Sequence, residues 1–178
     1  MPLVPLPRDY ENQSCPLARS LEIVGERWTL LILRDLFFGV RRFGQLQARL
    51  DIPRAVLSAR LAALVDHGLV ERRPYRPGRD ELLLTERARE LWPVVHGLMQ
   101  WGERHLVSDG PLRLFSHTGC GTTLTPDGEC PQCDVVPEPA EIETRPGPGK
   151  PPVLREDAVS RALRRPHRLL TPVVPTPG

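Results

Sequence analysis

The amino-acid sequence predicts a mainly α-helical domain with a β-hairpin, then a small zinc-ribbon-like module and a disordered Pro-rich tail. Apolar residues repeat at helical spacing as far as Gly68, and two short β-prone runs follow. Beyond them stand four His and Cys residues at metal-ligand spacing. The 178 residues suffice for one compact domain with appendages. We expect an arm over 1–14, the main domain over 15–110, the metal module over 111–136 and the tail over 137–178.

The overall composition is that of an ordinary water-soluble protein. Hydrophobic residues make up 40%, charged residues 26%, and the formal net charge is +2. No apolar stretch is long enough to cross a bilayer, and the N-terminus lacks the pattern of a signal peptide. We therefore expect a cytoplasmic protein without membrane contact, whose four cysteines are metal ligands or reactive thiols rather than disulfides.

Two helices are expected at the start of the main domain. Pro16 suits the first position of a helix, and the apolar residues after it repeat at helical spacing as far as Gly25. Residues 26–38 carry apolar side chains nearly all round a helix, so we expect a central, buried helix that ends at Gly39.

Two further helices are expected on either side of a tight turn. The first is short, covers 43–50 and ends at the break formed by residues 51–53. The second begins at Pro53 and ends at Gly68, with His67 as its cap. Its apolar positions form one buried stripe: Leu57, Leu61, Leu64 and Val65.

The periodicity then changes from helical to extended. The runs LVERRPY and DELLLT flank the turn sequence 76–79 and predict a hairpin. Thr85 is expected to cap a long last helix from Glu86 towards Val107, kinked at Pro93.

This order of elements is that of a winged helix-turn-helix, in which the second helix of the pair enters the major groove of DNA. Between Gly39 and Arg79 there are nine arginines and three acidic residues, so one segment of a nearly neutral chain is strongly basic. Lys150 is the only lysine among 24 basic residues, and arginine offers the planar fork that suits phosphate and guanine.

Three stretches of the chain resemble the HxlR-type winged-helix regulators of prokaryotes, which are relatives of the MarR group. They are CPLARSLEIVGERWTLLILRDLFFGVRRFGQL, LSARLAALVDHGLVERR and LLLTERARELWPVV, within a resemblance from about Cys15 to Trp101. The resemblance implies a homodimeric transcription factor, usually a repressor, that binds a pseudo-palindromic double-stranded DNA operator. It also implies a dimer contact made by the first helix and the long last helix.

The expected DNA contacts fall into three groups. In the resembled family, the basic turn that Arg41 and Arg42 match would hold phosphates. Arg54, Ser58 and Arg60 lie on or beside the first turns of the recognition helix and are candidates for groove contacts. The arginines of the hairpin suit the DNA backbone: Arg72, Arg73, Arg76 and Arg79. The alternative is that these arginines only solvate a surface.

The outward face of the recognition helix offers methyl groups at three positions: Ala55, Ala59 and Ala62. Base recognition would then depend on Arg54, on contacts with thymine methyl groups and on DNA shape.

Cys15 stands at the start of the first helix, where backbone N–H groups and the helix dipole favour a thiolate. Some members of the resembled family use a cysteine at this position to sense electrophiles or oxidants. We therefore hypothesise a redox or small-molecule signal. The alternative for Cys15 is a small apolar residue at the dimer contact.

Beyond the winged domain, the segment HTGCGTTLTPDGECPQC has two ligand pairs of two-residue spacing, His117 with Cys120 and Cys130 with Cys133. Nine residues with a Pro-Asp-Gly turn separate the pairs, which is the arrangement of a small zinc ribbon. Because the protein supplies all four ligands, we expect a structural Zn(II). The alternative is a set of free cysteines, with Cys130 and Cys133 acting as a dithiol.

Two other functions remain to be weighed against a transcriptional regulator. A zinc or thiol enzyme is disfavoured because the chain has no HExxH, no Gly-rich phosphate loop and no nucleophile elbow. A winged-helix adaptor that binds protein would not need the basic segment.

Overall fold

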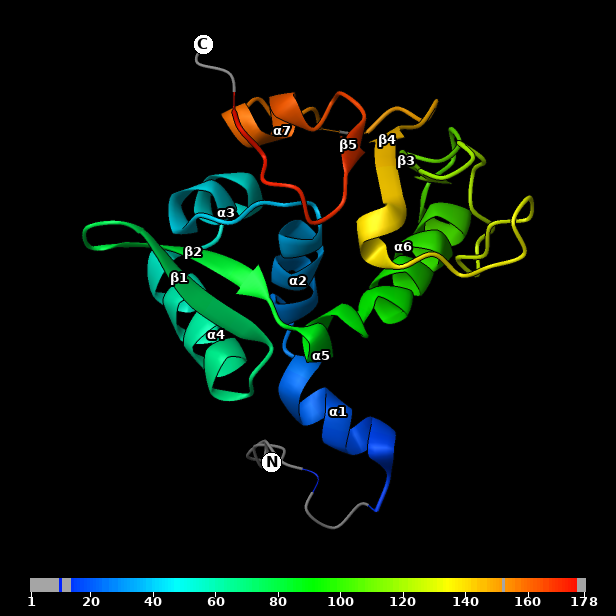
Figure 1. Cartoon of the computed structure of the whole chain (residues 1–178). Coiled ribbons are helices and arrows are strands. Elements are labelled where there is room, and N and C mark those ends of the chain that lie inside the picture. Colours follow the sequence, from blue (N-terminus) through cyan, green and yellow to red (C-terminus); the bar gives the residue numbers. More distant parts are fainter. Residues whose placement is uncertain (1–9, 11–13, 152, 176–178) are drawn as a thin grey trace, which may run out of the picture.

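The computed structural model describes residues 10, 14–151 and 153–175 of the chain. Helix α2 (Thr29–Phe37) lies at the centre, with the other elements arranged around it (Figure 1). Six of its nine residues are buried, as the apolar circumference predicts. It begins three residues later than expected because residues 26–28 form a turn, in which the Thr29 N–H donates to the Glu26 carbonyl at 2.9 Å.

The predicted helix-turn-helix is confirmed. Helix α1 (Pro16–Val24) leads into α2, and α3 (Phe43–Leu50) and α4 (Arg54–Asp66) form the pair. The turn between α3 and α4 uses a left-handed Asp51 (φ 53°) and buries Ile52. His67 caps α4, and Gly68 follows in the left-handed conformation (φ 67°).

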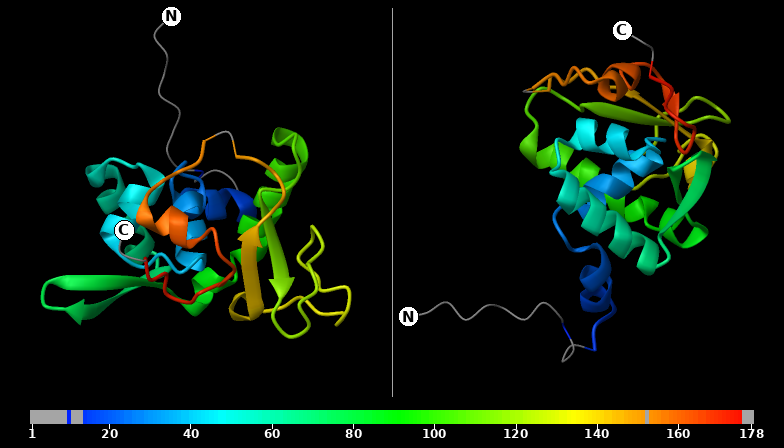
Figure 2. Two further views of the ribbon diagram at one scale, coloured as in Figure 1. Left: turned by 90° about the horizontal axis from the view of Figure 1, so that it is seen from above. Right: turned by 90° about the vertical axis from the view of Figure 1, so that its left-hand side faces the viewer.

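The predicted hairpin is also present, and we call it the wing. Strands β1 (Val70–Arg76) and β2 (Arg79–Leu84) are antiparallel, with Val70 opposite Leu84. The tip of the wing projects beyond the body of the molecule (Figures 1 and 2). Its base is fixed to the segment before α3, because the Leu82 N–H donates to the Arg41 carbonyl at 2.8 Å.

The prediction of one long, kinked last helix is wrong. The segment forms two helices, α5 (Glu86–Arg89), which Thr85 caps as predicted, and α6 (Trp92–Leu106). Pro93 has no N–H to donate to the preceding turn, and it lies in the first turn of α6, where none is needed. The proline therefore starts a new helix rather than bending an existing one.

Residues 111–151 and 153–175 form what we call the C-terminal layer. It contains β3 (Arg113–His117), a 3-10 turn η1 (Pro139–Glu141), β4 (Ile142–Pro146), α7 (Ala158–Ala162) and β5 (His167–Arg168). The strands make an antiparallel sheet in the order β3-β4-β5. Figures 1 and 2 show α7 and the end of this layer lying over α2 and α3.

The expected disorder of residues 137–178 does not hold for this layer, which lies largely inside that range. The prolines leave three longer proline-free runs, 140–145, 153–165 and 167–171, which contain β4 up to its last residue, α7 and β5. Apolar side chains of the segment are buried in the core shared with the winged domain: Ile142, Val159, Leu163, Leu169 and Val173. An average composition over the whole segment therefore hides a folded part.

The winged domain and the C-terminal layer share a single core. The ring of Phe115 on β3 lies 6.3 Å from that of Phe38, 5.5 Å from that of Trp92 and 5.2 Å from that of His96.

Among the residues that the structure describes, no helix is both long and apolar enough to cross a membrane.

Candidate DNA-binding face and metal centre

Helix α4 presents one open face. Its opposite face is anchored by Leu57, Leu61 and Leu64, all of which are buried. The predicted methyl-rich face is exposed and also carries the polar groups expected for the groove: Arg54, Ala55, Ser58, Ala59 and Ala62. The guanidinium of Arg54 lies 5.2 Å from the centre of the Phe43 ring, so α3 supports it from below.

The wing adds exposed arginines to this open face. Arg72, Arg76 and Arg79 are exposed, as a clamp on the DNA backbone requires. Tyr75 lies between two guanidinium groups, at 4.6 Å from that of Arg42 and 5.9 Å from that of Arg76. The sequence analysis gave Tyr75 no role, although an aromatic residue among arginines is a signal for such stacking.

Glu81 on β2 was also missed. Its carboxylate lies 3.7 Å from Arg42 Nε and 3.8 Å from an Arg73 nitrogen, and its side chain is only 15% exposed. The carboxylate therefore orients two of the predicted phosphate-binding arginines from the base of the wing. In the sequence, Glu81 is one of two adjacent acidic residues in the second hairpin strand, and no pattern distinguishes it from Asp80.

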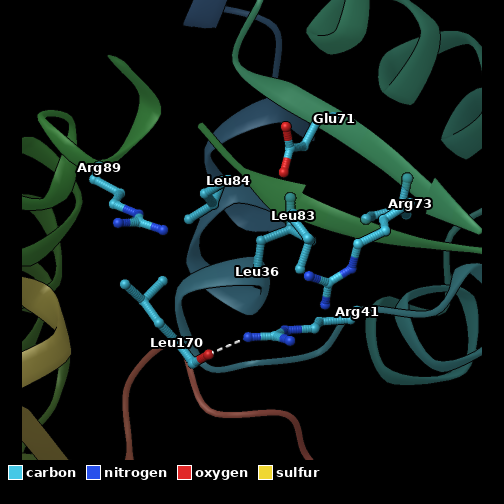
Figure 3. A pocket seen from close by; sticks show the side chains of 9 residues that line it. Leu36, Arg41, Glu71, Arg73, Leu83, Leu84, Arg89 and Leu170 are labelled. Atoms are coloured by element: carbon cyan, nitrogen blue, oxygen red, sulfur yellow. Dashed lines mark hydrogen bonds between the residues drawn. The ribbon is translucent and has the colours of Figure 1, made fainter. Parts of the chain in front are cut away.

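Two further arginines among the predicted DNA contacts are bound within the protein. Arg41 is partly buried and donates to the carbonyl of Leu170, from the C-terminal layer (Figure 3). Burial lowers the pKa of Arg41; Glu81 opposes this shift, and the positive charges of Arg73 and Arg89 add to it. Arg60 forms an ion pair with Glu26, at 3.5 Å, on the side of α4 that faces the turn before α2.

The four predicted metal ligands come together. One ligand atom from each of His117, Cys120, Cys130 and Cys133 lies within 4.8 Å of the others, so the group could hold a metal ion. The Sγ atoms of Cys120 and Cys130 are 3.4 Å apart, and His117 Nδ1 is 3.7 Å from the Cys120 Sγ.

Two matching turns create this cluster. After His117, the N–H of Gly121 donates to the His117 carbonyl at 2.7 Å, and after Cys130 the N–H of Asp134 donates to the Cys130 carbonyl at 2.9 Å. Gly121 and Asp134 are both left-handed, with φ of 76° and 57°. Each turn places the two ligand side chains of its pair on the same side of the backbone. Two such pairs can supply the four ligands of a tetrahedral metal ion.

The thiols of the cluster differ in acidity. Hydrogen bonds from Thr122 lower the pKa of Cys120 to about 6. The hydrogen bond with Cys120 and burial raise the pKa of Cys133 to about 11. One negative charge therefore forms readily in the cluster and opposes further ionisation, and a bound cation would remove that opposition.

Cys15 is exposed at the N-cap of α1, immediately before Pro16. Cys15 is far from the metal cluster along the chain. Among the described hydrogen bonds, none joins the Cys15 side chain to the first turn of α1.

The comparisons with known proteins match this geometry. Residues 23–109 fit the family model described as HxlR-like helix-turn-helix. An HTH-type transcriptional regulator of Mycobacterium tuberculosis strain H37Rv is 47% identical over 143 residues, covering 79% of this chain and 89% of its own length. The chain belongs to the HxlR-like helix-turn-helix family.

Other matches cover about half of this chain. A regulator of Synechocystis is 37% identical over 98 residues, which is 53% of this chain and 73% of the relative. The crystal structure of PA1607, a proposed transcription factor, is 40% identical with a TM-score of 0.51, covering 53% of this chain and 68% of its own. The mycobacterial match is longer than residues 15–110 and so extends beyond the winged domain.

This HxlR-like protein is a DNA-binding transcriptional regulator. The family match covers the helix-turn-helix and the wing, and the matched relatives are HTH-type transcriptional regulators rather than enzymes. The regulator predicted from the sequence is thereby confirmed.

Proposed function

We propose that the protein acts as a cytoplasmic homodimer that represses transcription by binding a pseudo-palindromic operator. The observation that carries this proposal is the open face of α4, flanked by the exposed arginines of the wing. Two copies of α4, spaced about one helical turn of DNA apart, would read two half-sites in successive major grooves.

The dimer is supported by apolar side chains that one chain leaves exposed. On α1, Leu17 is 66% exposed, and on α6, Leu98 and Trp101 are 52% and 55% exposed. Large apolar residues gathered on two helices of a water-soluble protein mark an interaction surface. A second copy is the proposed occupant, in agreement with the contact that the family resemblance implies.

The test is binding of the full chain to DNA fragments from its own upstream region, over a salt series and with excess nonspecific competitor. We expect competitor-resistant binding by a dimer. Arg76→Gln should reduce the salt slope by about one, because one phosphate contact is lost. Arg54→Gln should weaken specific binding most. Arg145→Gln, an exposed change on β4, is the matched control and should leave both quantities unchanged.

The adaptor function predicts the opposite result. Folded, metal-loaded protein would then fail to select any genomic fragment, and would bind a protein partner without salt dependence. That outcome would reject the operator proposal.

We also propose that the cluster of His117, Cys120, Cys130 and Cys133 holds a structural Zn(II). With Zn–S bonds of about 2.3 Å, tetrahedral sulfur ligands stand about 3.8 Å apart, which is close to the spacing of these atoms. The chemistry of one imidazole and three thiols suits zinc, and the protein completes the coordination shell. Denaturing release should yield one zinc ion per chain, and a metal-free folded protein would refute the proposal.

Cys15 is the proposed sensor of oxidants or electrophiles, because its thiol is exposed at the start of a helix. Diamide or a quinone should release the wild-type protein from its operator and leave Cys15→Ser bound. Equal release of both proteins would reject this role.

A further inference from the structure

A cavity of about 540 Å³ lies between the winged domain and the C-terminal layer, and none of the functions above uses it. Its walls come from the end of α2, from α3 and α6, from β3 and α7, and from residues of the segments 146–151 and 153–155. Sites for small organic ligands commonly have about 300–1,000 Å³. The cavity is therefore large enough for such a ligand.

Most of the wall is apolar. It is formed by side chains from both parts of the molecule: Phe38, Met99, Leu106, Leu112, Phe115 and Leu163. Phe38, Phe115 and Leu163 are buried members of the shared core, so this wall is held in place by packing. Such a surface suits a flat ring or a short acyl chain.

One part of the wall is positively charged. Arg34, Arg49 and Arg113 all line the cavity. Arg34 and Arg49 share one fully buried carboxylate, Asp35, whose Oδ1 lies 2.8 Å from Arg34 Nη2 and 3.1 Å from Arg49 Nε. Arg113 donates to neutral oxygens, the Thr144 hydroxyl at 3.2 Å and the Leu163 carbonyl at 2.6 Å.

A second carboxylate, Asp157, lies near Arg49 and pairs at 3.7 Å with Arg155, which also lines the cavity. The four guanidinium groups therefore exceed the two carboxylates, Asp35 and Asp157, that pair with them. The pKa of Arg113 falls to about 10, first because it is buried and then because of the positive charges of Arg49 and Arg34. The acidic residue of the wall, Glu103, accepts from the N–H groups of Leu112 and Arg113, at 2.8 and 3.3 Å, at the start of β3. A bound anion would relieve the repulsion among the arginines.

We propose that this cavity binds a small organic carboxylate with an apolar body. Arg49 Nη1 donates to the Ser160 hydroxyl at 3.0 Å, which leaves its Nη2 for a ligand. The carboxylate would lie at Arg49 and Arg113, and the body would lie against Phe38 and Met99. This site does not depend on the DNA-binding proposal, because ligand binding can be measured with the protein alone.

The test uses two carboxylates, 2-naphthoate and decanoate, and their neutral counterparts, 2-naphthalenemethanol and decanol. Each is titrated calorimetrically into the full-length, zinc-loaded protein. We expect saturable binding of at least one carboxylate, with one site per chain. The neutral counterpart should bind about tenfold more weakly or worse, because the charged hydrogen bonds are lost.

Three variants locate the site. Arg49→Gln removes a charge, Met99→Trp fills the apolar part, and Arg145→Gln is the control outside the cavity. The first two should each weaken carboxylate binding about tenfold or more, and the control should not change it. Circular dichroism of each variant establishes that it is folded, and Met99→Trp keeps the test decisive if Arg49→Gln is unstable.

Several results would overturn the proposal. They are the absence of saturable binding of both carboxylates, equal binding of the neutral counterparts, and carboxylate binding that persists unchanged in folded Met99→Trp. None of these results bears on operator binding, so the failure of this site is distinguishable from the failure of the proposed function.

Discussion

The winged domain and the C-terminal layer are held together by different means. In the winged domain, helix side chains make the core, and α2 alone buries six of its nine residues. The layer has short strands, with only two residues in β5. It is fixed to the winged domain by backbone hydrogen bonds, from Leu170 to the Phe37 carbonyl at 2.7 Å and from Val173 to the Gly39 carbonyl at 2.9 Å.

This difference has a consequence for stability. A region that buries its own apolar side chains is stabilised by that burial and does not depend on a neighbouring region. The layer contributes single apolar residues to a core that is formed mostly by the winged domain. The loop between β3 and η1 is held by the cluster of His117, Cys120, Cys130 and Cys133. We therefore expect the layer to loosen under conditions that leave the winged domain folded.

Loss of the zinc ion that we propose for the Cys130 cluster should separate the two regions most strongly. Structural zinc contributes apparent binding free energies of about 10–16 kcal/mol in small peptides, so its loss should exceed any single packing change. A chelator, or Cys130→Ser, should increase hydrogen exchange in β3 and β4 much more than in α2 and α4. Cys15→Ser is the control, because it removes a thiol outside the cluster. Equal exchange in metal-free and metal-loaded β3 would contradict the comparison.

Packing changes should come next in size. Phe37 is fully buried at 5.1 Å from the ring of Trp92, so Phe37→Ala should destabilise the whole protein by about 3–5 kcal/mol. Leu169→Ala, a buried change in the layer, should cost about 2–5 kcal/mol for the layer alone. Urea unfolding followed by hydrogen exchange distinguishes them. A single shared transition in Leu169→Ala would show that the regions unfold together.

The same contrast explains what the sequence could predict. In the winged domain the decisive contacts are local, so the apolar spacing in α4 predicts both the helix and its buried stripe. The two ligand pairs were predictable because each lies within one turn. The layer depends on partners that are distant in the chain, such as β3 for β4 and the Phe37 carbonyl for Leu170, and no local pattern reports them.

The site was predicted unevenly for the same reason. The open face of α4 follows from helical periodicity, and the structure places Arg54 and Ser58 there. The position of Arg41 depends on Leu170, 129 residues away. The local sequence predicted that Arg41 contacts phosphate, but in the folded protein its guanidinium already donates to the Leu170 carbonyl. Local charge predicts which arginines are available only where no distant segment covers them.

The junction itself can be broken at Gly39. This residue has φ of 79°, and an added Cβ would lie 1.7 Å from the Thr171 carbonyl oxygen. Gly39→Ala should therefore displace residues 167–173 and cost about 1–3 kcal/mol. Gly44→Ala is the control, because a Cβ there meets nothing within 4 Å and favours the helix α3. Thermal melts and hydrogen exchange of β5 measure the difference, and an undisturbed β5 in Gly39→Ala would show that the junction is not tightly held.

The smallest expected effect concerns His96, which lies on α6 beneath the layer. Its side chain is 3% exposed and packs at 5.2 Å from the ring of Phe115. Burial lowers the pKa of His96, while Asp127 opposes the shift. The folded protein therefore favours the neutral imidazole, and the unfolded chain takes up the proton at a higher pH.

The resulting stability is complete above the ordinary histidine pKa of about 6.5 and is lost as the pH falls from there through the lowered value. His96→Phe cannot bind this proton, so its Tm should fall less than that of the wild type between pH 7.5 and 5.5 (about two pH units around the histidine range). Acid would also release the proposed zinc ion from the cluster, but it would do so in both proteins, and the difference between the two curves isolates His96. Parallel curves would mean that the imidazole at the junction stays neutral, or is equally protonated, in both folded and unfolded states, and the two regions would then meet without a pH-sensitive contact.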